Sequence, residues 1–359
     1  MSNFEEIWTK ELETVNSALA DYLDFKISQI SKLGKYHTQF YEYLKEYFMR
    51  GGKRLRPILV AIGYKAINED VHHDHLYRAA CSMEILHNGT LLHDDLIDHD
   101  ETRRGGPTFH ARYRDAYLTH TDDQQKAFGW GMTMAIIGGD ILLNMGAQAI
   151  QDSELDDTTS VKCLTQYQTA YQYLGDGVML EMNMVYEPTV TPEIYLKMVS
   201  LKTAVLFYTS LLIGATIARA SESQLAALHE FGFKVGQAFQ MQDDILGSFG
   251  DESVTGKSAD GDIREGKKTM LLLKSYELAN LNQKKIIDDL LGKDDMTKEE
   301  VEQVRNVFKQ SGGFDATNTL MEQLLAEGQA ALDSAQPPLT PKYKEFLLAL
   351  SEFLTKRDY

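Results

Sequence analysis

The stretch Cys81-Ser-Met-Glu-Ile-Leu-His-Asn-Gly-Thr-Leu-Leu-His-Asp-Asp-Leu-Ile-Asp98 decides the fold of this 359-residue chain. Its apolar residues, Met83, Leu86 and Leu91 among them, recur at the spacing of one helical face, and the stretch contains little glycine and no proline. This pattern indicates a long buried helix. Carboxylates gather near the end of that helix, and this is where the first candidate site lies.

Three aspartates make up this first acidic cluster. Asp94 and Asp98 are four positions apart and therefore share a helical face, with Asp95 beside them. The pair Arg103-Arg104 and a Gly-Gly-Pro break follow. Carboxylates beside an apolar wall and close to guanidinium groups suit a metal ion that bridges carboxylate to phosphate. The alternative is a solvated helix end, since the chain has six Asp-Asp pairs and most of them must lie on the surface.

Among the other pairs, only Asp243-Asp244 has a similar setting. It lies near the end of an apolar helix expected over residues 235–246, and basic segments that contain glycine follow at 256–257 and 262–269. Mg²⁺ demands oxygen ligands and usually shares phosphate oxygens with its substrate. A pyrophosphate held by Mg²⁺, lysine and arginine becomes a good leaving group, because these cations neutralise the charge that develops on it.

The rest of the chain also predicts helices. Helix starts such as Thr191-Pro192 and the capping box of Ser221 with Gln224 recur along it, and alternating strand patterns are nearly absent. No long linker or shift in composition marks a boundary. We therefore expect one all-α domain over residues 1–359.

Charge and composition bear on partners and location. A formal net charge of −17 argues against nucleic acid and anionic membrane surfaces as partners. The two cysteines, Cys81 and Cys163, lie inside apolar helical patterns and suggest a reducing compartment. The N-terminus lacks the pattern of a signal peptide, and no run of about 18 uninterrupted apolar residues occurs. We expect a cytoplasmic protein without a transmembrane segment.

Several motifs in one order resemble those of the trans-type prenyl diphosphate synthases of the all-α isoprenoid synthase superfamily. They spread over a core from about residue 50 to about residue 270. The motifs are Gly51-Gly52-Lys53-Arg54-Leu55-Arg56-Pro57, Asp94-Asp95-x-x-Asp98 with Arg103-Arg104-Gly105, Lys202-Thr203, and Gln240-x-x-Asp243-Asp244 with Lys257 and Lys267. The resemblance implies a single large helical bundle with a central active-site cavity, and a homodimer.

The resemblance also implies a transferase that condenses isopentenyl diphosphate with an allylic diphosphate. The allylic diphosphate ionises, the isopentenyl double bond attacks the cation, and a proton is lost to the departing pyrophosphate. Three Mg²⁺ ions are expected, two held by Asp94, Asp95 and Asp98 and the third by Asp243 and Asp244.

Further residues receive roles by the same resemblance, and all of them lie within the motifs except His87. The residues expected to contact the allylic diphosphate are Arg103, Lys202, Lys267 and, in an assisting role, Lys257. Those expected to bind isopentenyl diphosphate are Gly52, Lys53, Arg56, His87 and Arg104. Thr203 and Gln240 are expected near the allylic carbon, where a hydroxyl or carbonyl dipole stabilises positive charge. One position departs from the family: Gly247 stands where the second motif usually has a third aspartate, and Asp251 is the candidate to act through water instead.

Gly89 and Thr90 bear on product length, because they lie about one turn below Asp94 on the same expected helix. Family members that stop at fifteen carbons generally carry Phe or Tyr at this level. Close helix packing is the alternative reason for Gly89, since glycine within a helix costs on the order of 1 kcal/mol relative to alanine. We predict a product longer than fifteen carbons. We favour a medium or long polyprenyl chain over geranylgeranyl diphosphate.

Two other classes of protein also bear on the function of this chain. Terpene cyclases and squalene-type synthases bind no isopentenyl diphosphate and lack the element found here at residues 51–57, which decides against them. A non-catalytic modulating subunit of a heteromeric synthase stays open as an alternative. Such subunits typically lose one aspartate-rich motif, whereas this chain keeps both.

Overall fold

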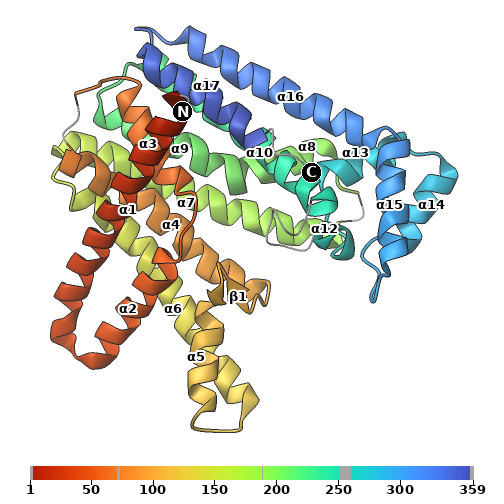
Figure 1. The fold of residues 1–359 in the computed structure, drawn as a ribbon, viewed down its shortest axis with the longest axis horizontal. Coiled ribbons are helices and arrows are strands. Elements are labelled where there is room, and N and C mark those ends of the chain that lie inside the picture. Colours follow the sequence, from red (N-terminus) through yellow and green to blue (C-terminus); the bar gives the residue numbers. More distant parts are fainter. Residues whose placement is uncertain (1–2, 71–72, 188, 251–259, 356–359) are drawn as a thin grey trace. The chain divides into compact units, whose positions relative to one another are not determined.

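The chain folds almost entirely into helices, which confirms the predicted all-α class (Figure 1). The computed structural model describes residues 3–70, 73–187, 189–250 and 260–355. The single sheet within those residues pairs β1 (Thr102–Arg103) with antiparallel β2 (Gly106–Pro107). The helices are α1 (Asn3–Ile30), η1 (Ser31–Leu33), α2 (Lys35–Met49), α3 (Leu55–Lys65), α4 (His73–Ile97), α5 (Phe109–Leu118), α6 (Gln124–Gln151), α7 (Asp157–Tyr186), α8 (Pro192–Val199), η2 (Ser200–Ala204), α9 (Val205–Ile217), α10 (Glu222–Phe249), α12 (Gly261–Arg264), α13 (Met270–Leu278), α14 (Leu281–Leu290), α15 (Lys298–Gln310), α16 (Gly313–Ala331), η3 (Leu332–Ser334) and α17 (Pro341–Thr355).

The helices form two compact units. The first unit comprises residues 1–168 and 210–220, and the second comprises residues 169–209 and 221–359. Helices α7 and α9 each begin in one unit and end in the other. That the whole chain forms a single domain stays a prediction.

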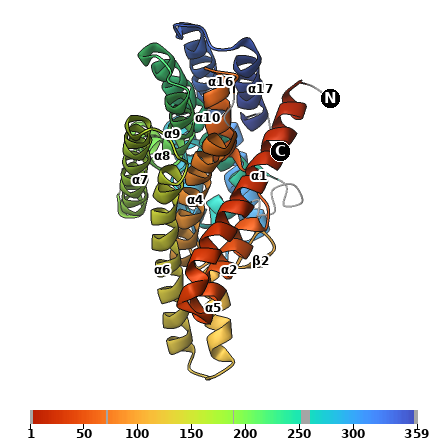
Figure 2. The ribbon, with the colours of Figure 1, turned by 90° about the vertical axis from the view of Figure 1, so that its left-hand side faces the viewer.

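In the first unit, α4 is the central helix. It packs along α6 and also contacts α1 and α3 (Figure 1, Figure 2). Small residues of α6 allow this close approach, since Gly138 faces the side chain of Leu92 and Gly139 faces the ring of His93. The tight packing fixes the direction of α4 and therefore the position of the aspartates at its end.

In the second unit, α10 has the corresponding place. It packs against α16, α8 and the π-helical turn η2. Gly236 of α10 lies against Ala204, and Gly232 lies against Tyr208. An apolar cluster that includes Met198, Met241 and Leu324 fills the space around α10. This core holds the second aspartate pair in place.

The predicted helix starts are confirmed. Thr191 caps α8 and accepts from the amide of Ile194, with proline at the first position of the helix. Ser221 and Gln224 form the capping box that opens α10. Such caps typically contribute about 1 kcal/mol each, because they satisfy amides that have no partner within the helix.

Among the described residues, two helical stretches are long and apolar enough to cross a membrane: Gln124–Gln151, which is α6, and Pro192–Ile217, which comprises α8, η2 and α9. In the most apolar 18 residues of each stretch, 50% and 67% of the residues, respectively, are buried inside the structure. Core helices pass the same test of length and composition, so two such helices are weak support for a membrane span. The absence of a transmembrane segment stays a prediction.

Candidate active site

The first acidic cluster lies at the carboxyl end of α4. Asp94 and Asp98 are one turn apart, and the Asp98 amide donates to the Asp94 carbonyl at 2.8 Å. Asp95 is completely buried. One of its carboxylate oxygens accepts a hydrogen bond from the hydroxyl of Tyr47 at 2.8 Å, and the other accepts one from Nε of Arg103. Burial raises the pKa of the Asp95 carboxyl, and the nearby Arg103 acts in the opposite direction.

The β1–β2 ribbon returns Arg103 to α4. Arg103 pairs with Gly106, so Arg104 and Gly105 form a two-residue turn. Both turn residues have positive φ, 51° and 73°, as a type I′ turn requires. Arg50 anchors this ribbon, since its Nη1 donates to the carbonyl of Pro107 at 2.7 Å. The "Gly-Gly-Pro break" of the sequence is therefore a hairpin that aims a guanidinium group at Asp95.

Basic side chains surround His87, which is partly buried on α4. Burial lowers the pKa of His87 well below its usual value, and Arg56, Arg104 and Arg103 lower it further. The guanidinium of Arg104 lies against Gly52, where a Cβ atom would come within 3.1 Å of Cζ. Its Nη1 is buried and has no hydrogen-bond partner among the residues that the structure describes. A buried cation in this state suits an anionic ligand.

Four of the five predicted isopentenyl-binding residues thus contact or electrostatically affect one another, and Lys53 is exposed next to them in the chain. Arg54 serves a structural role instead. It is buried with positive φ, and it donates to Oε1 of Glu84 at 2.8 Å and to the carbonyl of Phe48 at 2.5 Å. These bonds fix the basic turn in the core of the first unit.

The second acidic cluster lies on α10. Asp244 is buried, and its oxygens accept from the hydroxyl of Tyr195 at 2.5 Å and from Nε2 of Gln240 at 3.0 Å. Gln240 in turn accepts from Oγ1 of Thr203 at 2.8 Å. Asp243, the neighbour of Asp244, is partly exposed. The structure thus links three of the residues predicted from the sequence in one hydrogen-bond chain.

Lysines complete the second cluster. Lys202 and Thr203 lie in the π-helical turn η2, an arrangement that often marks functional sites. Lys202 forms an ion pair with Glu181 of α7. Burial alone would lower the pKa of Lys267, but the carboxylates of Asp244, Asp262 and Glu181 outweigh it and raise that pKa. Lys257 and Asp251, which the sequence also indicated, lie outside the described residues.

Asp262 fills the space beside Gly247. A Cβ atom at position 247 would lie 2.5 Å from Oδ2 of Asp262, so no larger residue fits there without a shift. Asp262 also lies 3.7 Å from the ammonium of Lys267. A carboxylate therefore stands next to the position where the family's third aspartate is missing.

Gly89 faces α6 at close range. A Cβ atom on it would lie 3.1 Å from Cβ of Leu142 and 3.3 Å from the carbonyl oxygen of Gly139. These contacts support close packing of α4 on α6 as the reason for the glycine, and a role of Gly89 in product length stays a prediction. Thr90 is buried and its hydroxyl donates to the carbonyl of His87 at 2.8 Å.

The oxygen donors fit a metal ion that is shared with substrate. Within the described part of the chain, no three His, Cys, Asp or Glu side chains are placed to hold an ion by themselves. Asp94 and Asp98 in one unit and Asp243 in the other are partly or fully exposed carboxylates. Mg²⁺ accepts such partial sets because phosphate oxygens and water complete its shell.

Five contributing residues were missed by sequence reasoning: Tyr47, Arg50, Glu181, Tyr195 and Asp262. Four of them are common residue types on helix faces or in turns, and only their distant partners give them a role. Asp262 stands in the basic segment that the sequence did single out, and a count of carboxylates there could have found it.

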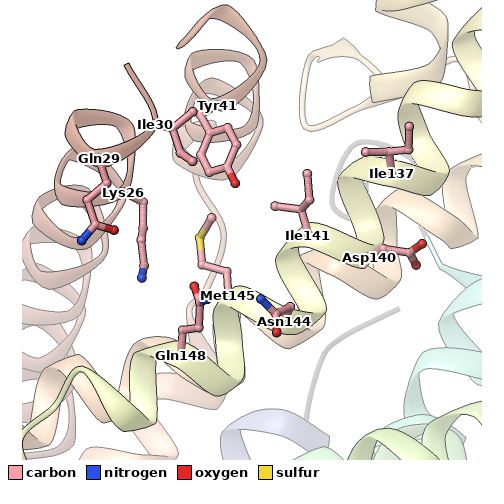
Figure 3. Close-up of a pocket in the computed structure, with 10 residues that line it drawn as sticks. All are labelled: Lys26, Gln29, Ile30, Tyr41, Ile137, Asp140, Ile141, Asn144, Met145 and Gln148. Atoms are coloured by element: carbon pink, nitrogen blue, oxygen red, sulfur yellow. The ribbon is translucent and has the colours of Figure 1, made fainter. Parts of the chain in front are cut away.

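A separate cavity of about 410 Å³ lies in the first unit between α1, α2 and α6 (Figure 3). Lys26, Asp140 and Gln148 line it together with apolar side chains such as Ile141. None of the predicted site residues lines this cavity, so it is no test of the predicted central cavity.

Comparison with known proteins gives consistent matches. The model of the family described as polyprenyl synthetase matches residues 37–308. The geranylgeranyl diphosphate synthase of Saccharolobus solfataricus is 36% identical over 264 residues, 73% of this chain and 74% of that protein. The enzyme of the same name from Sulfolobus acidocaldarius is 32% identical and covers 86% of each chain. A crystal structure of the Corynebacterium glutamicum geranylgeranyl pyrophosphate synthase, complexed with isoprenyl diphosphate and magnesium, superposes with a TM-score of 0.89 at 28% identity, over 98% of this chain and 99% of that one.

Proposed function

This chain belongs to the polyprenyl synthetase family, and on that premise we propose that it condenses isopentenyl diphosphate with an allylic diphosphate. The observation that supports this most strongly is the pair of similarly built acidic clusters with cations beside them, at the end of α4 and on α10. The arginines around His87 offer a binding site for a second diphosphate.

The metal site is assigned to the carboxylates. We propose three Mg²⁺ ions, two at Asp94 and Asp98 and one at Asp243. When bound, they neutralise the charge that develops on the departing pyrophosphate. Direct ligation by Asp95 and Asp244, expected from the sequence, stays a prediction, because each carboxylate already accepts two hydrogen bonds in this structure.

The remaining residues bind and orient the substrates. Arg103, Lys202 and Lys267, assisted by Lys257, hold the allylic diphosphate, and Gly52, Lys53, Arg56, His87 and Arg104 hold isopentenyl diphosphate. The hydroxyl of Thr203 donates a hydrogen bond to Gln240, so the lone pairs of the Thr203 oxygen are available to stabilise positive charge at the allylic carbon. The isopentenyl double bond forms the new carbon–carbon bond, and the departing pyrophosphate takes the proton that is released.

We propose geranylgeranyl diphosphate, with twenty carbons, as the product. The two curated relatives described above carry that name. It agrees with the prediction of a product longer than fifteen carbons, while the close packing at Gly89 weakens the support for a medium or long chain.

A homodimer in the cytoplasm is the proposed state of the enzyme. Both cysteines are unpaired and buried, as suits a reducing compartment. Exposed apolar side chains gather on α6 and α7, and such patches mark interaction surfaces. They are Phe128, Trp130, Met132, Ile136 and Ile137 on α6, and Val161, Tyr171, Tyr173, Met179, Met182, Val185 and Tyr186 on α7.

The test is incubation of the purified chain with isopentenyl diphosphate, Mg²⁺ and each allylic diphosphate of five to twenty carbons, followed by mass spectrometry of the products. We expect elongation, and we expect Asp94→Ala to reduce turnover about a thousandfold or more while the fold survives. Asp122→Ala, in an acidic pair outside the two clusters, is the control. No elongation with any primer would favour the modulating subunit instead.

A further inference from the structure

The two acidic clusters share a feature that no motif of the sequence shows. In each, the second aspartate of the pair is buried and has a tyrosine hydroxyl on one oxygen. The tyrosine comes from a different helix in each case, Tyr47 from α2 and Tyr195 from α8. Both tyrosines are themselves buried, with 2% and 1% of their surface exposed.

The second oxygen also has a donor in both clusters. Asp95 accepts from Arg103, and Asp244 accepts from Gln240. A carboxylate with a donor on each oxygen has a fixed rotamer, because any rotation would break a hydrogen bond in a buried place. The preceding aspartate, Asp94 or Asp243, lies in the same helical turn, so its backbone position is fixed as well.

The first cluster has a particular need for such support. Helix α4 ends at Ile97, so three aspartates crowd its carboxyl end, where the helix dipole is negative. Like charges at that end repel one another and favour fraying of the last turn. The hydroxyl of Tyr47 and the guanidinium of Arg103 offset this by binding the central carboxylate. Tyr47 is held in turn, since the guanidinium of Arg50 lies 5.5 Å from the centre of its ring.

We infer that Tyr47 and Tyr195 are positioning residues, which hold Asp95 and Asp244 so that Asp94 and Asp243 present their carboxylates to the metal-bound diphosphate. This inference rests on the proposed function and deepens it. It assigns the two members of each aspartate pair to different tasks: the exposed member faces the ion, and the buried member fixes the helical turn.

The experiment compares Tyr47→Phe, Tyr195→Phe and a matched control, Tyr22→Phe. Each change removes one hydroxyl and keeps the ring. Tyr22 is similarly buried, and its hydroxyl donates to the partly exposed Asp152 at 2.9 Å, so the control also breaks a tyrosine–aspartate bond, but one outside the two clusters. Two quantities are measured: the midpoint of thermal unfolding without metal, and the Mg²⁺ concentration that half-saturates binding of an unreactive allylic thiolodiphosphate in calorimetry.

All three variants are expected to lose some thermal stability. Only Tyr47→Phe and Tyr195→Phe should raise the half-saturating Mg²⁺ concentration, by about 10- to 100-fold, as for other groups that orient metal ligands. An unchanged Mg²⁺ requirement in both variants, or an equal rise in Tyr22→Phe, overturns the inference. Absence of Mg²⁺-dependent binding in the wild type overturns it too.

A double-mutant cycle separates action through the aspartate from a general loss of packing. If Tyr47 acts through Asp95, the Tyr47→Phe change should leave the Mg²⁺ requirement of Asp95→Asn nearly unaltered. Additive effects would contradict the inference. Because binding is measured with an unreactive analogue, a chain that binds as expected but elongates no primer would refute the proposed function and leave the positioning role standing.

Discussion

Asp94 and Asp95 are adjacent in the chain but occupy different environments. Asp94 is partly exposed on the face of α4 that also carries Asp98, whereas Asp95 is completely buried under Tyr47 and Arg103. The helical turn of about 100° per residue produces this difference. One Asp-Asp pair therefore supplies both a group for a ligand and a group that fixes the turn.

Replacement of Gly89 tests the packing explanation. Gly89→Ala should destabilise the protein by about 1 kcal/mol, because the overpacking against Leu142 exceeds the helical gain of alanine. Gly129→Ala on α6 is the matched control: a Cβ atom there meets nothing within 4 Å, so this change should stabilise by about 0.5–1 kcal/mol. Urea unfolding measures both. Equal stabilisation by the two changes would mean that Gly89 has free space after all.

His87 predicts a pH dependence of stability. Its pKa is lowered from the usual 6.5 in the folded chain, by burial first and then by Arg56 and Arg104. As the pH falls below about 6.5, His87 binds a proton in the unfolded chain but not in the folded chain. The free energy of unfolding therefore decreases, by at most about 1.4 kcal/mol per pH unit. His87→Gln should reduce this slope in urea titrations between pH 7 and 5, whereas His120→Gln, at an exposed position, should keep it. An unchanged slope in His87→Gln would show that His87 does not cause the pH dependence.

At the scale of elements, the β1–β2 ribbon brings the basic part of the first cluster, Arg103, to the aspartates at the end of α4. Its two-residue turn reverses the chain directly after α4, and Arg103 thereby reaches Asp95, eight positions earlier. Arg50 holds the ribbon from the end of α2. The site thus depends on a short segment that has no hydrophobic core of its own.

Arg50→Ala tests this dependence. Loss of the bonds to the carbonyls of Pro107 and Arg103 should loosen the ribbon and reduce kcat/KM about tenfold, as removal of groups that orient metal ligands generally does. Arg50 and Arg112 form ion pairs with the same carboxylate, Glu46, at 2.8 and 2.6 Å. Arg112→Ala is the control, because among the described residues no side-chain hydrogen bond joins Arg112 to the ribbon. Steady-state kinetics at saturating Mg²⁺ compares the variants. Equal losses in both would show that Glu46, rather than the ribbon, matters.

Local sequence patterns predicted the helices, their caps and the residues of both acidic clusters. They could not predict the ribbon, since its turn places Arg104 at positive φ, a conformation that arginine rarely adopts on local grounds. They also missed Tyr47 and Tyr195, because a tyrosine on a helix face gains its role only from a carboxylate 48 or 49 positions away. They left two reasons open for Gly89 for the same cause: the atoms that confine it belong to α6.

For the whole molecule, the exposed apolar side chains of α6 predict self-association. Light scattering after gel filtration should give about twice the chain mass of 40.6 kDa. Ile136→Lys, at a position 43% exposed on α6, should shift the protein towards monomer, because a buried unpaired charge is costly in an interface. Leu281→Lys is the control on α14, where the leucine is 86% exposed. A monomeric wild type, or no effect of Ile136→Lys, would contradict the homodimer proposed over α6.

Independent features of the molecule agree on its chemistry. The acidic clusters, the basic surrounding of His87 and the family match over residues 37–308 indicate one chemistry. A terpene cyclase would release pyrophosphate without consuming isopentenyl diphosphate, and a modulating subunit would do neither. A prenyltransferase of this type must couple the two processes, because each condensation ionises one allylic diphosphate.

The most direct test therefore measures both quantities in one reaction with farnesyl diphosphate as primer and Mg²⁺ present. We predict one pyrophosphate released for each isopentenyl diphosphate consumed, a twenty-carbon product, and neither process after chelation of the metal. Release of pyrophosphate without consumption of isopentenyl diphosphate, or equal rates in Asp94→Ala, would contradict this prediction.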